Sequence, residues 1–369
     1  MDNARVFYLV YGLTSGGIEN YSVNLFKHID KKNIQIDFIV KFSKHEFLDD
    51  EFFAAGGKKI ALNVENKGKL AYLINMIRIA KSGYNVGHFN LSEPSAVFKY
   101  PLICRLVGIK KIIIHSHNSS EDTSNFIKLI INWISRILIN RISSVKLACS
   151  DKAALWMFGK TNDFVLINNG IEVDKYIYNC NVRKKIRGEL HCKDDTVLLG
   201  HVGRFVKQKN HFFLIEIFDK FLKLNSNSKL LLIGVGPYFD KIKDFVKMKN
   251  INDKVIFLGE KNNVNDYLQA MDVFLLPSLY EGLPVSGVEA QASGLKCFFS
   301  SSISQDSKIT DNVDFIDLEK GAEYWAKQIT LNINYTRKNQ RQVIVDKGFD
   351  IATTSKIIEN YILEKSSVK

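Results

Sequence analysis

Several common patterns are absent from this chain of 369 residues. No stretch reaches the roughly 20 uninterrupted apolar residues that a membrane span needs, and the N-terminus lacks the layout of a signal peptide. The cysteines are few, odd in number and without Cys-x-x-Cys spacing, which argues against a disulfide framework. They are Cys104, Cys149, Cys180, Cys192 and Cys297. We therefore expect a cytoplasmic protein.

Patterns that would indicate particular chemistries are missing as well. No cluster of His, Cys, Asp and Glu has metal-ligand spacing, and no Gly-x-Ser-x-Gly elbow or full Gly-x-Gly-x-x-Gly fingerprint is present. We therefore expect no metal and no cofactor. Zinc-finger spacing and RNA-binding aromatic motifs are also lacking, so nucleic acid is not an expected partner. The net charge of +12 instead suits phosphorylated ligands or an anionic membrane surface.

Strand-like apolar runs alternate with helical patterns in both halves of the chain. This alternation predicts an α/β fold with two Rossmann-like, doubly wound domains, and the chain is too long for one typical core. The strands predicted in the first half are 6–10, 36–40, 59–62, 86–89, 111–115, 145–149 and 164–167. Those predicted in the second half are 197–202, 230–233, 255–258, 273–276 and 296–299.

The domains are expected over residues 1–175 and 176–345, followed by a closing segment at 346–369. The polar stretch Asp174–Asp195 is the expected link, and one continuous helix is expected over 95–107. Open α/β sheets bind ligands beyond the carboxyl ends of their strands. We therefore expect a ligand in the cleft between the two domains.

The predicted helix at 125–142 is apolar almost all round and carries Trp133 with a few basic residues. Between Ala96 and Leu147 the chain has eight Lys or Arg and two acids. Such a helix can lie on an anionic membrane. Burial against the sheet explains the apolar residues equally well, so both interpretations stay open.

Two glutamates, Glu281 and Glu289, flank a Gly-x-Pro turn that follows an apolar strand. Pro284 fits the first turn of a helix. The free N–H groups of a helix N-terminus suit a phosphate, and neighbouring carboxylates can accept hydrogen bonds from sugar hydroxyls. The pattern predicts a nucleotide-sugar site. Acids that merely stabilise the helix dipole are the alternative.

A glycine-containing loop follows the first strand of each half. Gly16-Gly17 lets backbone N–H groups approach a phosphate closely, although a simple tight turn would look the same. Gly203 is followed by Arg204 and Lys209, two cations that could neutralise a diphosphate leaving group. A solvated basic loop is the alternative there.

Polar side chains follow the strand 111–115 in the run His115-Ser116-His117-Asn118. Because carboxyl ends of strands commonly face ligands, His117 could donate to a sugar hydroxyl or help with proton transfer. The turn Asn168-Asn169-Gly170 could line the same region or be a plain turn.

In this order the motifs resemble those of the retaining, nucleotide-sugar-dependent glycosyltransferases of family 4, which have the GT-B fold. The chain is most similar to the branch that builds capsular and exopolysaccharides, over roughly residues 5 to 300. The motifs are those at Gly16–Glu19, His115–Asn118, Asn169–Glu172, Gly203–Lys209, Leu232–Gly236, Phe257–Gly259 and Glu281–Glu289. The serine-rich segment Ser300–Asp317 departs from the family, since many relatives have a glycine-rich turn there.

The resemblance implies a role for each matched position. Gly17, beside Gly16, would lend its N–H to the donor diphosphate, which Arg204 and Lys209, beside Gly203, would stabilise as it leaves. Glu289 would hold the ribose hydroxyls, and Glu260 would lie in the loop that holds the base. Glu281 would contact hydroxyls of the transferred sugar, helped by N–H groups near Leu283, Pro284 and Val285. His117 would face the sugar or the acceptor, and the last helix would cross back onto the first domain.

The expected activity is retaining transfer of a hexose or N-acetylhexosamine from a UDP-sugar to a glycan or lipid-linked glycan. The partners would be the nucleotide-sugar, a polyprenyl-diphosphate-linked acceptor and an anionic membrane touched peripherally at its cytoplasmic face. A sugar-nucleotide epimerase or phosphorylase of the same fold is one alternative, and a non-catalytic sugar-nucleotide-binding protein is another. An epimerase would turn over UDP-sugar without an acceptor, and a sensor would bind without turnover.

Overall fold

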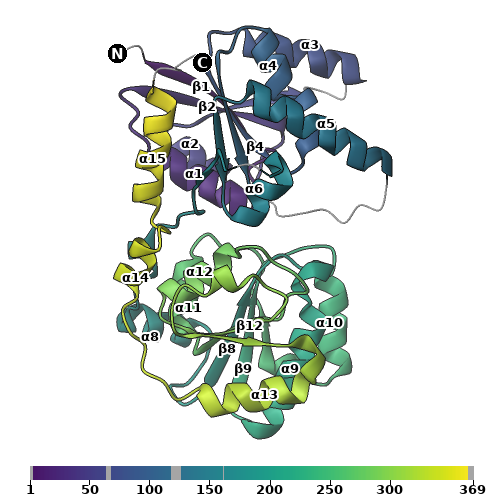
Figure 1. Cartoon of the computed structure of the whole chain (residues 1–369). Coiled ribbons are helices and arrows are strands. Elements are labelled where there is room, and N and C mark those ends of the chain that lie inside the picture. Colours follow the sequence, from purple (N-terminus) through teal and green to yellow (C-terminus); the bar gives the residue numbers. More distant parts are fainter. Residues whose placement is uncertain (1–2, 64–67, 118–125, 161, 365–369) are drawn as a thin grey trace. The chain divides into compact units, whose positions relative to one another are not determined.

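A computed structural model describes residues 3–63, 68–117, 126–160 and 162–364 (Figure 1). The chain divides into two compact units, the first formed by Met1–Gly170 with Ile351–Lys369 and the second by Ile171–Asp350. The expected boundaries at 175 and 345 each differ by five residues from these divisions (175 − 170 and 350 − 345). The last helix, α15 (Ile351–Leu363), belongs to the first unit and packs against α1.

The first unit is built on a parallel sheet with the strand order β3-β2-β1-β4-β5-β6-β7. Its strands are β1 (Ala4–Leu9), β2 (Ile34–Phe42), β3 (Lys58–Asn63), β4 (Val86–Leu91), β5 (Lys111–Ser116), β6 (Val145–Ala148) and β7 (Val165–Leu166). Its other helices are α1 (Gly17–His28), α2 (Asp49–Ala54), α3 (Gly68–Ala80), η1 (Pro94–Phe98), α4 (Pro101–Leu106), α5 (Phe126–Ile142) and α6 (Asp151–Phe158). All seven strands were expected from their apolar runs.

Helices cover both faces of this sheet, as Figure 1 shows. On β5, Ile113 joins the core formed with α1, α2 and α15, whereas Ile112 and Ile114 join the core formed with α3 to α6. Alternate side chains of a strand point to opposite faces. A strand of a doubly covered sheet therefore reads as an unbroken apolar run.

The second unit repeats the design with the order β10-β9-β8-β11-β12-β13, again all parallel. Its strands are β8 (Val197–Val202), β9 (Ser228–Ile233), β10 (Val255–Phe257), β11 (Val273–Leu276), β12 (Lys296–Ser300) and β13 (Val313–Ile316). Its α-helices are α7 (Val173–Tyr176), α8 (Cys180–Glu189), α9 (His211–Leu224), α10 (Phe239–Met248), α11 (Val264–Ala270), α12 (Val285–Ala292), α13 (Gly321–Asn332) and α14 (Arg341–Asp346). Short 3₁₀ turns are η2 (Lys207–Lys209), η3 (Asn252–Lys254), η4 (Gln305–Ser307) and η5 (Leu318–Lys320).

Two expectations about this fold were wrong. The single helix predicted over 95–107 is divided into η1 and α4, because Pro101 begins a new helix and its predecessor Tyr100 is not helical (φ −126°, ψ −69°). The polar stretch 174–195 is not a link but contains α7 and α8 of the second unit. Arg187 anchors α8, since its buried guanidinium donates to the carbonyl oxygen of Ala270 at 3.0 Å and to the carboxylate of Asp272 at 3.2 Å.

Candidate functional site

In each sheet the strand order reverses beside the first strand, between β1 and β4 and between β8 and β11. Ligands of open α/β sheets bind outside the carboxyl ends of the strands at such a point. The loop after β8 carries Gly203, Arg204 and Lys209, and the loop after β11 leads to Glu281. The structure thus places four of the predicted site residues where this fold binds ligands.

Two hydrogen bonds of Gln208 join these two loops. Its carbonyl oxygen accepts from the N–H of Leu279 at 2.8 Å, and its side-chain amide donates to the carbonyl oxygen of Tyr280 at 2.9 Å. As a result, Lys209 Nζ lies 2.6 Å from Glu281 Oε1, with side chains only 15% and 10% exposed. Two residues predicted separately therefore form one ion pair. Nothing in the sequence pattern singled out Gln208.

The loop after β8 carries Gly203 and the loop after β9 carries Gly234, and the backbones of these two loops meet closely. Gly234 has φ +133°, and a Cβ at this position would lie 2.2 Å from the carbonyl oxygen of Gly203. The N–H of Gly203 donates to the carbonyl oxygen of Ile233 at 3.0 Å. Arg204 then stands exposed, and among the residues that the structure describes no ion pair engages it. An exposed guanidinium beside a partly buried ammonium is suited to an anionic ligand.

Glu289 lies on α12, and Tyr176 of α7 donates a 2.8 Å hydrogen bond from its hydroxyl to Glu289 Oε1. Desolvation raises the pKa of Glu289 from 4.5 to about 7, although the Tyr176 hydrogen bond lowers it. The site therefore holds a carboxyl group that titrates near neutral pH. Tyr176 was missed in the sequence because it falls within the stretch taken for a link.

The beginning of α12 differs by one position from the expectation. Pro284 is the N-cap residue, with φ −71° and ψ 114°, and the helix begins at Val285. The carbonyl oxygen of Pro284 accepts from the N–H groups of Gly287 and Val288 at 2.9 and 3.2 Å. Val285 and Ser286 come before these two residues in the chain. Their N–H groups lie at the helix N-terminus, where an anion can be bound. Leu283 comes immediately before the cap.

Glu260 lies at the carboxyl end of β10, on the far side of β9 from the β8 loop. The carbonyl oxygen of Gly259 accepts from the N–H of Gly234 at 2.8 Å, which ties this loop to the one beside Gly203. All the predicted donor-binding residues from Gly203 to Glu289 therefore belong to the second unit, on loops and a helix start at one end of its sheet.

The first unit holds His117 directly after β5, and both of its ring nitrogens are engaged. Nδ1 is 2.9 Å from Asn169 Oδ1, and Nε2 is 2.9 Å from Asn90 Oδ1. Burial lowers the pKa of His117 to about 4, so the ring is neutral at pH 7. The Asn90 amide donates to the carbonyl oxygen of Leu9, which fixes its oxygen toward Nε2–H. In a neutral ring only one nitrogen carries a proton, so a ring that donates from Nε2 to Asn90 does not also donate from Nδ1 to Asn169.

His115 does not share this position. Its ring is fully buried and lies 4.0 Å from the His117 ring and 5.6 Å from the His88 ring, centroid to centroid. Burial holds its pKa well below 6.5. His115 is therefore a core residue, whereas Asn118 lies outside the described residues. The sequence did not single out Asn90, which is the second-last residue of β4, the strand next to β5.

Gly16 and Gly17 form the expected strand-to-helix turn. Gly16 caps α1 with an extended backbone, and its carbonyl oxygen accepts from the N–H of Asn20 at 3.0 Å. A Cβ on Gly16 would lie 2.1 Å from Glu19 Oε2, so the Glu19 carboxylate folds over this helix start. A carboxylate at a helix N-terminus occupies the kind of position that a phosphate would take.

Within residues 3–63, 68–117, 126–160 and 162–364, no group of three or more His, Cys, Asp or Glu is arranged to hold a metal ion. No helix in the same part of the chain is long and apolar enough to cross a membrane.

The chain has relatives among glycosyltransferases. Residues 182–344 match the family model for glycosyl transferases group 1. The chain is 29% identical to EpsF of Bacillus subtilis, itself named only as a candidate glycosyltransferase, over 88% of this chain and 86% of the relative. It is 24% identical to the UDP-Gal:alpha-D-GlcNAc-diphosphoundecaprenol alpha-1,3-galactosyltransferase of Escherichia coli, over 94% and 93%. It is also 24% identical to the capsular polysaccharide biosynthesis glycosyltransferase CapH of Staphylococcus aureus, over 98% and 99%.

Among solved structures, HepE of Anabaena in complex with UDP and glucose matches with a TM-score of 0.80 and 16% sequence identity. The match covers 98% of this chain and all of that one. At this identity the likeness shows the fold alone, which is the GT-B fold. The chain therefore has the GT-B fold, and it is a glycosyltransferase most of whose second unit matches the group 1 family model.

Proposed function

We propose that this enzyme transfers a hexose or N-acetylhexosamine from a UDP-sugar, with retention, to a lipid-linked glycan in the synthesis of a surface polysaccharide. The observation that carries the proposal is the Lys209–Glu281 ion pair, set beside exposed Arg204 at the carboxyl ends of β8 and β11. A relative named for a UDP-galactose donor and a diphosphoundecaprenol acceptor supports this choice of substrates. Retention follows only from the resemblance to family 4.

In the proposed reaction the bond from the sugar's anomeric carbon to the diphosphate oxygen breaks. A bond from that carbon to an acceptor hydroxyl oxygen forms on the same face, and the hydroxyl proton passes to the departing phosphate oxygen. Arg204 and Lys209 would offset the negative charge that develops on the diphosphate. The pairing of Lys209 with Glu281 holds both side chains in place before the donor arrives.

The ribose would bind at Glu289. An ionised carboxylate there accepts hydrogen bonds from two vicinal hydroxyls, while Tyr176 keeps the carboxylate oriented from the protein side. The N-terminus of α12 would face negatively charged or hydroxyl oxygens of the donor through its free N–H groups. We also propose that no metal or other cofactor takes part, because the two cations can supply the positive charge.

Gly17 and His117 keep the roles that the resemblance implies. His117 would contact the sugar or acceptor as a hydrogen-bonding group. Because its nitrogens are held by Asn90 and Asn169, a sugar hydroxyl would have to replace one of these amides. Its low pKa argues against a proton donor at neutral pH.

Transfer to a lipid-linked acceptor requires access to a membrane, and we propose that the outer face of α5 provides it. The positions of α5 that are buried are Asn132, Ser135 and Ile139. Its exposed apolar side chains are Phe126, Ile127, Leu129, Ile130, Ile131, Trp133, Ile134 and Ile137. A surface helix that exposes this many apolar side chains is suited to contact another apolar surface. The segments 94–117 and 126–144 contain seven Lys or Arg and no Asp or Glu, which suits an anionic bilayer.

The membrane proposal is tested by co-sedimentation with vesicles containing phosphatidylglycerol. Trp133 is 62% exposed, and Trp133→Glu should abolish binding. Leu331→Glu is the matched control, because Leu331 is a 75% exposed apolar residue on α13 of the other unit. Equal binding by the wild type and the Trp133 variant, or equal binding to phosphatidylcholine vesicles, would rule out the proposed surface.

The catalytic proposal is tested first by thermal-shift screening against nucleotide-sugars and then by UDP release with a polyprenyl-diphosphate-linked acceptor. Lys209→Ala and Glu289→Ala should each reduce turnover at least a hundredfold in a folded protein. Lys207→Ala is the control, since Lys207 is an exposed lysine two positions away. Full activity in either site variant would refute the assigned roles. Consumption of a UDP-sugar without any acceptor would instead favour an epimerase.

A further inference from the structure

The His201 side chain of β8 carries a buried ring nitrogen that the mechanism has not used. His201 is fully buried, and its Nδ1 lies 2.8 Å from the carbonyl oxygen of Leu275 on β11. A carbonyl oxygen only accepts, so Nδ1 carries the proton of the neutral ring and Nε2 keeps a bare lone pair. Nε2 has no hydrogen-bond partner among the residues that the structure describes. Buried polar atoms are nearly always hydrogen-bonded, so this lone pair marks a place where a donor is expected.

The bare lone pair lies beside the loop after β8. A Cβ on Gly203 would lie 3.0 Å from His201 Nε2 and 3.3 Å from Lys209 Cε. The imidazole and the Lys209 side chain therefore flank the same small space over Gly203. Burial lowers the pKa of His201 to about 4, and the positive charge of Lys209 lowers it further. The ring is thus neutral at pH 7 and lies close enough to Lys209 to be affected by its charge.

His211 fixes the orientation of this ring. It begins α9, two residues after Lys209. The His211 ring stacks on Phe205 at 4.0 Å and meets the His201 ring edge-on at 4.8 Å, centroid to centroid. Both His211 and Phe205 are buried. The His201 ring is therefore held between the Leu275 carbonyl and His211, with Nε2 kept on the side of Lys209.

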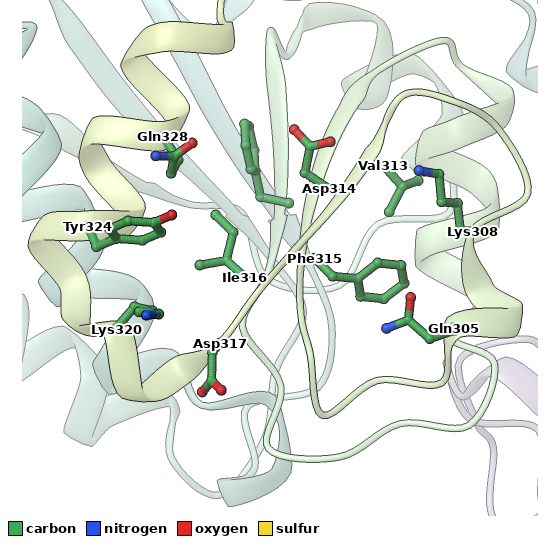
Figure 2. A pocket seen from close by; sticks show the side chains of 11 residues that line it. Gln305, Lys308, Val313, Asp314, Phe315, Ile316, Asp317, Lys320, Tyr324 and Gln328 are labelled. Carbon is green, nitrogen blue, oxygen red and sulfur yellow. The ribbon is translucent and has the colours of Figure 1, made fainter.

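This nitrogen is separate from a cavity of about 430 Å³ in the same unit (Figure 2). The cavity lies beside β13, three strands from β8 in the order of the sheet. Its charged lining residues balance one another, with Lys308 and Lys320 against Asp314 and Asp317. His201 does not line this cavity, so a ligand bound there would not reach Nε2. The lone pair therefore belongs with the loop after β8.

We propose that His201 is a positioning residue for Lys209, and that its Nε2 accepts a hydrogen bond from the Lys209 ammonium when the donor diphosphate is bound. An ammonium has three N–H groups. Glu281 is paired with this ammonium in the free enzyme, and a phosphate oxygen would draw another N–H. An N–H that still points into the protein needs an acceptor, which Nε2 supplies. The inference rests on the proposed function, in which Lys209 meets the diphosphate.

A neutral acceptor suits this position better than a charged one. A second carboxylate would neutralise Lys209 and repel the diphosphate, whereas an imidazolium would repel the Lys209 ammonium. A neutral imidazole accepts the hydrogen bond and leaves the charge of Lys209 free to offset the negative charge that develops on the leaving group. The Leu275 carbonyl, by holding the proton on Nδ1, keeps Nε2 in the form that can accept.

Two variants separate positioning from packing. His201→Asn places an amide N–H where Nδ1 lies and so keeps the Leu275 bond, but it offers no acceptor at the Nε2 position. It should lower kcat at least about tenfold and keep the KM for the UDP-sugar within about threefold, because the charge that Lys209 offsets develops at the transition state. His201→Gln places an amide oxygen near the Nε2 position and loses the Leu275 bond. It should keep kcat within about threefold of the wild type.

His211→Phe is the control, because it keeps the stack on Phe205 and should turn over normally. Circular dichroism checks that each variant is folded. A kcat that falls in His201→Gln and not in His201→Asn would show a purely structural role and overturn the proposal. An equal loss in His211→Phe and His201→Asn would overturn it as well.

Nitrogen NMR of protein with isotopically labelled histidine tests the hydrogen bond without any transfer reaction. The His201 Nε2 resonance, identified by its loss in His201→Asn, should move toward the position of a hydrogen-bonded nitrogen when UDP is added. Lys209→Ala at saturating UDP should show no such movement. UDP binding with an unmoved resonance would overturn this inference alone. A wild type that does not bind UDP in calorimetry would overturn the proposed donor site and this inference together.

Discussion

The titration of Glu289 makes a quantitative prediction for UDP binding. Its pKa in the free enzyme is about 7, raised from 4.5 by desolvation. Ribose hydroxyls donate to the ionised form, so bound UDP should return the pKa toward its ordinary value. The free enzyme must then lose a proton to bind UDP below pH 7. The linkage predicts a Kd about tenfold weaker at pH 6 than at pH 8, because the free carboxyl is about 90% protonated at pH 6.

Isothermal titration calorimetry at pH 6, 7 and 8 measures this dependence directly. Glu289→Gln is the matched control, because it keeps the size and the Tyr176 contact but cannot titrate. UDP itself gains a proton near pH 6, and this contribution is the same in both proteins. The variant should bind about 5–30-fold more weakly at pH 8, since a charge-assisted hydrogen bond is replaced by a neutral one. A wild-type Kd that does not change with pH, or a variant that keeps the full dependence, would refute the ribose assignment.

Three further predictions concern stability, the β8 loop and metal ions. Burial lowers the pKa of His88 to about 3 and those of His117 and His201 to about 4, below the unfolded value of 6.5. The unfolded chain therefore binds more protons as the pH falls below 6.5, and each histidine should cost about 2 kcal/mol by pH 5. A urea midpoint unchanged between pH 7 and pH 5 would contradict this. Gly234→Ala should lower UDP affinity at least tenfold through its clash with the Gly203 carbonyl, whereas Gly188→Ala, with nothing within 4 Å of the new Cβ, should bind UDP normally. EDTA should leave the turnover of metal-free enzyme unchanged, and restoration of activity by Mg²⁺ or Mn²⁺ would refute the cation roles of Arg204 and Lys209.

Much of the fold could be predicted because doubly covered parallel strands are apolar on both faces. The run Lys111-Ile-Ile-Ile-His115 is an example, since its isoleucines divide between two cores. β13 was missed because its sequence Val-Asp-Phe-Ile carries a charged residue at an open edge, where only one neighbour pairs. α8 was missed for a related reason. Its Arg187 is buried because its guanidinium donates to the carbonyl oxygen of Ala270, which lies far along the chain, and no local pattern indicates that contact.

The residues of the candidate site could be predicted from the sequence in part, but the contacts between them could not. Individual residues such as Lys209 and Glu281 could be selected from their positions after strands, because parallel strands end at one edge of a sheet. Their direct pairing could not, since it depends on Gln208 bonding to a loop some 70 residues later. Asn90 and Asn169 around His117 show the same limit, because Asn90 lies in β4 and Asn169 on the loop after β7, and they become partners only when the sheet forms.

Helix α5 shows why periodicity alone left two interpretations open. When nearly every position is apolar, the pattern has no polar face from which to infer the buried side. The structure supplies that information, because Asn132, Ser135 and Ile139 face the protein while Phe126, Ile130 and Trp133 face outward. A helix that covers a sheet normally turns most of its apolar residues toward that sheet. The large exposed apolar surface favours a function for the outer face of α5 and makes the vesicle experiment the more informative test of the acceptor's location.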